Sequence, residues 1–259
     1  MTDAFYIREG DQYVATEHTR GPWSPQHQHG GPPTALIAHV AQALAPELSI
    51  ARITVDFLRP VPIDRLAVRI ETVRSGSKVQ RLAGTLVHGD TPLARAMLTL
   101  VRPTGVEVAG AGPADALPSP ELSRPFQFPF FREPNGYHTA MESRLALGTF
   151  GRGRVAIWMR QRVPLLPDVV PSPVERVLLA ADSGSGVSAG IDHTTLTAIN
   201  FDLTVALHRP LEGEWVGLDS VSTYDPVGIG LADTRIVDAR GPLGRALQGL
   251  LVERRPGAR

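Results

Sequence analysis

Two stretches of this chain, 150 positions apart, align without a gap, and this internal repeat constrains the fold more than any other feature. From Thr54 to Leu100, prolines, turn residues and apolar alternation stay in phase with the second stretch. Repeats that stay in phase build the same supersecondary units, so the sequence predicts one fold used twice. The identical pairs are Thr54-Val55 with Thr204-Val205, Arg59-Pro60 with Arg209-Pro210, Pro92-Leu93 with Pro242-Leu243, and Arg95-Ala96 with Arg245-Ala246.

One position breaks the symmetry of the repeat, because Leu98 in the first copy corresponds to Gln248 in the second. Side chains alternate across a strand, so Gln248 shares a face with the apolar Ala246 and Leu250. An amide buried there without partners costs on the order of 1 to 3 kcal/mol. We therefore expect Gln248 to have polar partners, and we expect the chemistry to lie in the second copy.

Charge and composition exclude several classes of protein. The 26 basic and 26 acidic side chains cancel, so the net charge does not favour a nucleic-acid partner. The absence of cysteine excludes disulfides, thiolate metal sites and cysteine nucleophiles. The N-terminus has no basic segment leading into an apolar run, and no stretch is long enough to span a bilayer. We therefore expect a soluble, cytoplasmic protein without a membrane partner.

Each copy is predicted to contain one helix followed by four strands. The apolar spacing in 33–44 predicts a helix that Pro46 ends, and the capping box Ser172-Pro173-Val174-Glu175 opens the second helix. A Gly-, Ala- and Pro-rich linker at 104–125 separates an N-terminal domain, 1–103, from a C-terminal domain, 126–259. The predicted strands are 5–7, 13–15, 53–58, 66–73, 79–88 and 93–101 in the first copy, and 137–147, 154–164, 197–207, 215–224, 229–238 and 243–253 in the second.

A helix followed by an antiparallel meander predicts a sheet curled around that helix, so the expected α+β architecture is a tandem, or double, hot-dog. Three motifs resemble the double hot-dog acyl-CoA thioesterases of type II: the Gly30-Gly31 pair, Phe57-Leu58-Arg59-Pro60, and Leu207-His208-Arg209-Pro210. The resemblance covers nearly the whole chain outside the linker. It implies hydrolysis of an acyl-CoA by residues of the second half: a helical aspartate, a threonine or serine on the next strand, and a glutamine on the last strand.

Carried over position by position, these residues fall on Asp182, Asn200 and Gln248. Asn200 departs from the family pattern, since its amide can hold a water but cannot relay a proton as a hydroxyl does. The residues themselves agree with the assignment. Burial raises the pKa of a carboxyl group unless hydrogen bonds from amides offset it, and a carboxylate so held suits the orientation or deprotonation of a water. The two amides are expected to place that water and to polarise the substrate carbonyl.

Each residue also has a purely structural interpretation. Gln248 can be a substitution without functional consequence in a copy that has diverged. Asp182 can be the first residue of the loop that ends its helix. Asn200 and Asp202 can lie on a strand face that is exposed to solvent. Asp202 lies two residues beyond Asn200 on the same face, so it is a second candidate for contact with substrate. At the start of the first helix, His29, Gly30 and Gly31 are expected to bind substrate through exposed backbone amides.

Two other patterns are interpreted as unrelated to function. The segment Gly186-Val187-Ser188-Ala189-Gly190 matches a nucleophile elbow, but a helix precedes it and no histidine follows His208, so a serine triad is not expected. His27 and His39 lie near His29 without an acidic cluster, so no metal site is predicted, and no cofactor is implied.

The predicted function is hydrolysis of an acyl thioester to free acid and thiol. One alternative is an enoyl-CoA hydratase of the same fold. Such enzymes use an aspartate and a histidine a few residues apart, whereas Asp192 and His193 are adjacent, which argues against this alternative. Another is a non-catalytic acyl-CoA or lipid binder, which Asn200 at the hydroxyl position favours. A monomer and a homodimer are both compatible with two hot-dogs in one chain.

Overall fold

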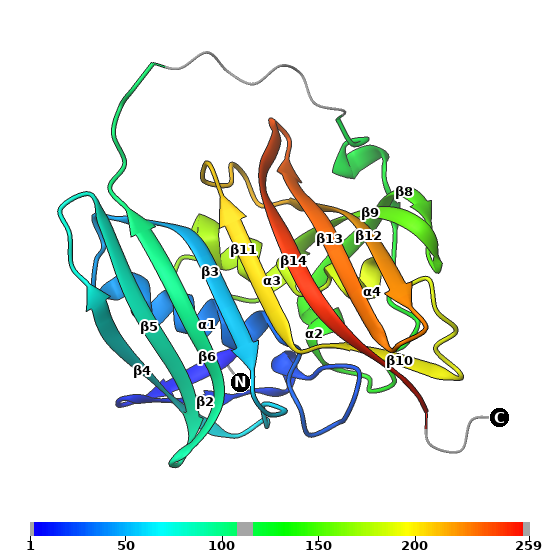
Figure 1. Cartoon of the computed structure of the whole chain (residues 1–259), viewed down its shortest axis with the longest axis horizontal. Helices are drawn as coiled ribbons and strands as arrows, with labels where there is room; N and C mark the ends of the chain where they lie inside the picture. Colours follow the sequence, from blue (N-terminus) through cyan, green and yellow to red (C-terminus); the bar gives the residue numbers. More distant parts are fainter. Residues whose placement is uncertain (1–2, 108–115, 256–259) are drawn as a thin grey trace.

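The computed structural model describes residues 3–107, the N-terminal half, and residues 116–255, the C-terminal half. Residues 108–115 of the predicted linker lie outside this description. The described segments form a single 14-stranded antiparallel sheet that runs through both halves (Figure 1).

The N-terminal half has its helix behind its four long strands in Figure 1. A hairpin precedes the helix, and four long strands follow it. The last three form a meander, but the first pairs with the last of them and not with the second, which differs from the predicted four-strand meander. The strand order is β1-β2-β4-β5-β6-β3. The elements are β1 (Tyr6–Glu9), β2 (Gln12–Ala15), the 3₁₀ turn η1 (Glu17–Thr19), α1 (Gly31–Ala43), β3 (Ser49–Phe57), β4 (Arg65–Arg74), β5 (Val79–His88) and β6 (Thr91–Val101).

The C-terminal half repeats this plan in the order β11-β14-β13-β12-β9-β8-β7, with β10 paired to β14. The expected capping box opens its helix: Glu175 N donates to Ser172 Oγ, and Ser172 N donates to Glu175 Oε2. The elements are η2 (Pro120–Leu122), β7 (Arg124–Pro125), α2 (Tyr137–Ala140), β8 (Met141–Thr149), β9 (Arg152–Gln161), α3 (Pro173–Ala181), α4 (Gly184–Val187), β10 (Leu196–Asn200), β11 (Asp202–Leu207), β12 (Val216–Asp225), β13 (Ile229–Asp238) and β14 (Gly241–Arg254).

The two halves join where β3 pairs with β11, and the register of this pairing repeats the 150-residue offset of the sequence. Thr54 lies opposite Thr204, and their hydroxyl oxygens are 3.1 Å apart. The flanking pairs are Asp56 with Asp202 and Arg52 with Ala206. A shift of 150 exchanges these two pairs, so an approximate twofold axis passes through the Thr54–Thr204 pair. The predicted double hot-dog architecture is confirmed.

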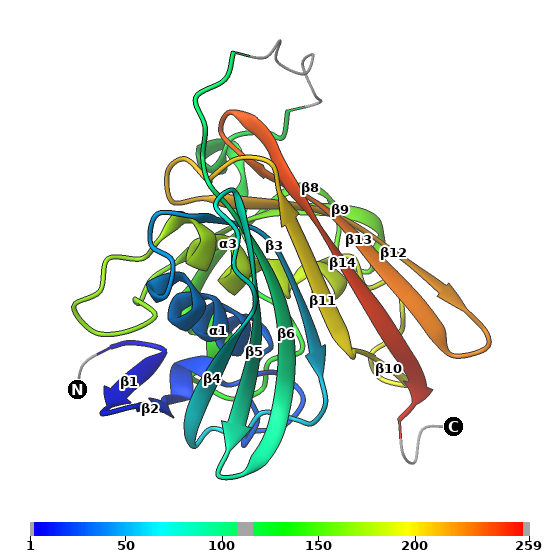
Figure 2. The same cartoon turned by 60° about the vertical axis from the view of Figure 1, so that its left-hand side comes forward.

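The core lies between the sheet and the two long helices, which pack on each other on one side of it (Figures 1 and 2). Leu36 and Ile37 of α1 and Leu178 and Leu179 of α3 are fully buried. This apolar packing brings the start of α1 close to the end of α3. None of the helices in the described part of the chain has the length and apolar content needed to cross a membrane.

Three segments differ from the sequence prediction. The strand expected from residue 137 begins as the short helix α2, and β8 starts only at Met141. The strand expected over 197–207 breaks at Phe201, whose N–H donates to Gly249 O while its carbonyl accepts from Phe57 N. Both parts of the broken strand pair with β14, and only β11 also pairs with β3, so the break shifts the register with β14 by one residue and leaves Asn200 at the end of β10. The segment predicted as an unstructured linker contains η2 and β7, and the domain boundaries stay a prediction.

Candidate active site

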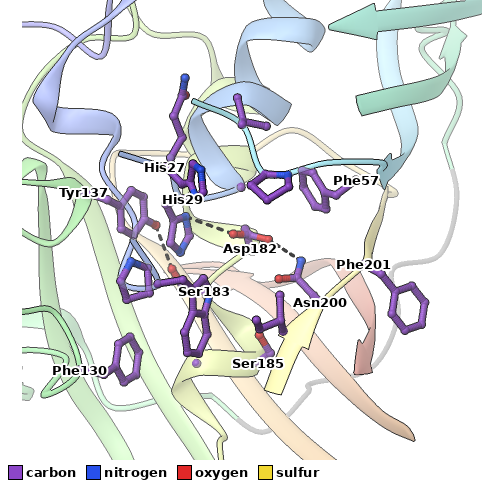
Figure 3. Close-up of a pocket in the computed structure, with 18 of the residues that line it drawn as sticks. His27, His29, Phe57, Phe130, Tyr137, Asp182, Ser183, Ser185, Asn200 and Phe201 are labelled. Carbon is purple, nitrogen blue, oxygen red and sulfur yellow. Dashed lines mark hydrogen bonds and ion pairs between the residues drawn. The ribbon is translucent and has the colours of Figure 1, made fainter. Parts of the chain in front are cut away.

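A cavity of about 340 Å³ lies where the two halves meet, between the start of α1 and the end of α3 (Figure 3). Its polar and charged groups come from both halves: His27, Gln28, His29 and Arg59 from the N-terminal half, and Asp182, Ser183, Ser185 and Asn200 from the C-terminal half. Aromatic side chains form much of the remaining wall, which is mainly apolar. These are Trp23, Phe57, Phe128, Phe130, Phe131, Tyr137 and Phe201.

Asp182 caps the C-terminus of α3, and two amides hold its carboxylate in the cavity wall. Asn200 Nδ2 donates to Asp182 Oδ1 over 2.8 Å, and Gln248 Nε2 donates to the same oxygen over 3.3 Å and to the main-chain oxygen over 3.0 Å. Only 5% of the Asp182 side chain is exposed. The structure thus brings together the three predicted catalytic residues, with one carboxylate oxygen bound by amides.

The two amides orient the carboxylate and have no hydrogen left for a substrate. The second hydrogen of Asn200 Nδ2 goes to Asp202 O over 3.1 Å, and both hydrogens of Gln248 Nε2 go to Asp182. Gln248 Oε1 accepts from Ser185 N over 2.9 Å. The prediction that buried Gln248 has polar partners is confirmed, since it is 1% exposed and bonds on both sides of its amide. Polarisation of a substrate carbonyl, the other expected role, is not available to these N–H groups.

His29 faces the other carboxylate oxygen, with its Nδ1 3.2 Å from Asp182 Oδ2. Gly31 N–H donates to the same ring nitrogen over 3.2 Å. The imidazole lies flat on Tyr137, with ring centroids 3.7 Å apart and planes 4° from parallel. Burial lowers the pKa of His29 below its ordinary range, and the negative charge of Asp182 opposes this by raising it. The imidazole is therefore neutral at pH 7.

Tyr137 supports the site by stacking on the imidazole of His29. Its hydroxyl donates to Leu179 O over 2.7 Å and lies 2.9 Å from Ser183 Oγ. Burial raises the pKa of this hydroxyl, so it stays protonated. A single side chain thus fixes the plane of His29 and the end of the helix that carries Asp182.

Gly30 and Gly31 allow α1 to approach α3, a role different from the expected exposure of amides to substrate. A Cβ on Gly30 would lie 2.8 Å from Asp182 Oδ2 and 2.8 Å from Phe57 Cζ, and a Cβ on Gly31 would overlap Leu179 O. Gly30 lines the cavity, whereas Gly31 does not.

We expect Gly30→Ala to lower kcat by tenfold or more, because displacement of a catalytic group by about 1 Å costs on the order of a hundredfold. The added methyl group pushes on Asp182 Oδ2, while the backbone of Gly30, with φ of −70°, suits alanine without strain. Steady-state kinetics beside a thermal melt test this. A wild-type kcat in a folded variant would contradict it.

Asp202 does not reach the cavity. Its carboxylate accepts from Gly249 N over 2.5 Å and holds the backbone of β14, so its predicted contact with substrate has no support in the geometry. Ser188, the residue of the apparent nucleophile elbow, donates to Gly184 O and contacts Ser222 Oγ. Within residues 3–107 and 116–255, no group of three or more acidic or histidine side chains is placed to hold a metal.

Sequence reasoning missed Tyr137 and the aromatic wall. The chain has only eight phenylalanines, and four of them fall within 126–131. This concentration was a usable signal, because an apolar cluster in a segment without regular structure needs a partner surface. Phe128, Phe130 and Phe131 all line the cavity.

Two family models match consecutive parts of the chain. Residues 19–101 match the acyl-CoA thioesterase N-terminal domain, and residues 108–252 match the acyl-CoA thioesterase C-terminal domain. The chain belongs to the acyl-CoA thioesterase family. Membership in this acyl-CoA thioesterase family makes it a thioester hydrolase.

Solved structures with low sequence identity share the acyl-CoA thioesterase fold over nearly their whole length. A candidate thioesterase from Novosphingobium aromaticivorans has a TM-score of 0.79 at 19% identity, covering 95% of this chain and 98% of the other. A hot-dog protein of unknown function from Alicyclobacillus acidocaldarius has a TM-score of 0.76 at 15% identity, covering 99% and 98%. The acyl-CoA thioesterase II TesB2 from Mycobacterium marinum has a TM-score of 0.69 at 16% identity, covering 97% and 95%. No curated protein matches the chain.

Proposed function

We propose that the chain hydrolyses acyl-CoA thioesters and that Asp182 is the base that activates the attacking water. The observation that carries this proposal is the asymmetric environment of the carboxylate. Two amides bind Oδ1, whereas Oδ2 faces His29 at the cavity. A carboxylate fixed through one oxygen leaves the other available to a water. The family match supports the choice of acyl-CoA as substrate.

In the proposed reaction, a water bound at Asp182 Oδ2 attacks the thioester carbonyl carbon and gives its proton to the carboxylate. Asn200 Oδ1 is an acceptor that can hold the second hydrogen of the water, since only the nitrogen of its amide is occupied by Asp182 and Asp202. The apolar walls exclude other water and strengthen these electrostatic contacts. Collapse of the tetrahedral intermediate breaks the C–S bond and releases acid and thiol.

Release of free thiol from acyl-CoA esters of graded chain length tests this function. The cavity of 340 Å³ lies at the lower end of the range of about 300 to 1,000 Å³ found for ligand pockets. We therefore expect turnover to be highest for short or ring-containing acyl groups and to fall for long chains. A protein that binds these esters without releasing thiol from any of them would contradict the proposal and favour the non-catalytic binder.

The His29–Asp182 pair favours hydration of 2-enoyl thioesters as a second candidate function. Hydration needs a group that activates water for attack at Cβ and a group that delivers a proton to Cα. Asp182 and His29 are such a pair, assembled from both halves, whereas the adjacent Asp192 and His193 considered from the sequence do not line the cavity. Loss of the conjugated double bond of an enoyl-CoA, followed by ultraviolet absorbance, would reveal this activity.

A further inference from the structure

His29 contacts the proposed base directly, and the hydrolysis described above gives it no role. Its Nδ1 lies 3.2 Å from Asp182 Oδ2 and also accepts the N–H of Gly31. A ring nitrogen that accepts from Gly31 carries a lone pair, so the hydrogen of the neutral imidazole lies on Nε2. The lone pair of Nδ1 then faces an oxygen that also carries lone pairs. A proton on Oδ2 turns this repulsion into a hydrogen bond.

We propose that His29 is a second catalytic residue, which protonates the departing thiolate with the proton that Asp182 has taken from water. This inference rests on the proposed thioester hydrolysis. A role for His29 as proton donor explains why this histidine of the N-terminal half contacts a carboxylate of the C-terminal half. An alkyl thiolate released into an apolar cavity is an unpaired charge, and proton transfer to it as the C–S bond breaks removes that charge.

The atoms balance as follows. Water oxygen bonds to the carbonyl carbon, and one water proton moves to Asp182 Oδ2. As the C–S bond breaks, sulfur takes the electron pair of that bond and the proton of His29 Nε2. His29 Nδ1 accepts the proton from Asp182 Oδ2 at the same time. The products are the carboxylic acid and the thiol. Asp182 is again a carboxylate, His29 is again neutral with its hydrogen on Nδ1, and exchange with solvent restores the first tautomer.

The surroundings of His29 fix the ring for this transfer. Stacking on Tyr137 sets its plane and Gly31 N–H sets its tautomer. Only 11% of the side chain is exposed, and the ring lines the cavity. A histidine that served packing alone would not need its nitrogen directed at the one carboxylate oxygen that the amides leave unbound.

The test compares two thioesters that share one short acyl group and differ in the leaving thiol. N-acetylcysteamine is an alkyl thiol whose thiolate needs a proton, whereas thiophenolate is a much weaker base and leaves without one. We expect His29→Gln to lower kcat for the N-acetylcysteamine ester by roughly a hundredfold, and for the phenyl ester by less than about threefold, because general-acid catalysis contributes about 10²- to 10⁴-fold where it is needed. His29→Phe keeps a ring against Tyr137 and is expected to show the same ratio.

Two control variants make the result decisive. Asp182→Asn removes the base and the source of the proton that His29 relays, so it should slow both esters, the N-acetylcysteamine ester at least as much as the phenyl ester. His27→Gln changes the other imidazole on the cavity wall, which has no contact with Asp182 among the interactions of the described residues, so any loss should be equal for both esters. Equal losses in His29→Gln and His29→Phe would overturn the role of His29 and leave hydrolysis standing. A wild-type protein that hydrolyses neither ester would overturn the proposed function and this inference together.

Discussion

Asp182→Asn is expected to lower kcat for acyl-CoA hydrolysis by at least about a hundredfold, the lower end of what general-base catalysis contributes, with the fold intact. Asparagine keeps an oxygen that accepts from Asn200 and Gln248, as Asp182 Oδ1 does. Its NH₂ group takes the place of Oδ2 and can donate to His29 Nδ1. The geometry survives and only the base is lost, so thiol release should fall while the melting temperature stays near that of the wild type.

Asp202→Asn is the matched control for this variant. Asp202 is also an acidic residue near the junction of β10 and β11, and asparagine can still accept the N–H of Gly249. Because its carboxylate lies outside the cavity, we expect kcat and KM to remain near the wild-type values. The reverse pattern, an active Asp182→Asn variant and an inactive Asp202→Asn variant, would identify Asp202 as the base in place of Asp182.

The repeat made the architecture predictable. Side-chain alternation and helical spacing depend on local chain geometry, so β5 and β13 match their predicted ranges of 79–88 and 229–238. The equivalent residues Thr54 and Thr204 pair with each other at the centre of the sheet, a contact that the offset of 150 alone did not predict. The prediction was wrong where tertiary contacts decide local structure, as at Phe201, where the expected strand breaks into β10 and β11.

The sequence indicated site residues in both halves, but it did not indicate how those of one half contact those of the other. The asymmetry of the repeat indicated Gln248, and the resemblance supplied Asp182 and Asn200. His29 and Tyr137 could not be assigned their contacts, because those contacts depend on how α1 packs against α3, which no periodicity encodes. The same packing explains Gly30 and Gly31, whose missing Cβ atoms make room for protein atoms where we had expected a ligand.

Gln248→Leu should lower both stability and turnover, because it places in the second copy the residue found in the first and removes all the hydrogen bonds of the amide. The Oδ1 and main-chain oxygens of Asp182 lose a donor, and Ser185 N loses its acceptor. A buried polar group left unpaired costs about 1 to 3 kcal/mol, so we expect a lower melting temperature. With one amide left on Oδ1, the carboxylate is less well oriented, and we expect kcat to fall by at least about tenfold.

Leu98→Gln, the reciprocal change, separates stability from catalysis. Leu98 is fully buried in β6, and an amide there without partners costs on the order of 1 to 3 kcal/mol, comparable to the loss in Gln248→Leu. It lies outside the cavity, so the folded fraction of Leu98→Gln should keep the wild-type kcat. If both variants lose stability and both keep kcat, Gln248 serves the core alone, and the break in the repeat has no part in the chemistry. If only Gln248→Leu loses kcat, the amide is required because it holds the Asp182 carboxylate in place.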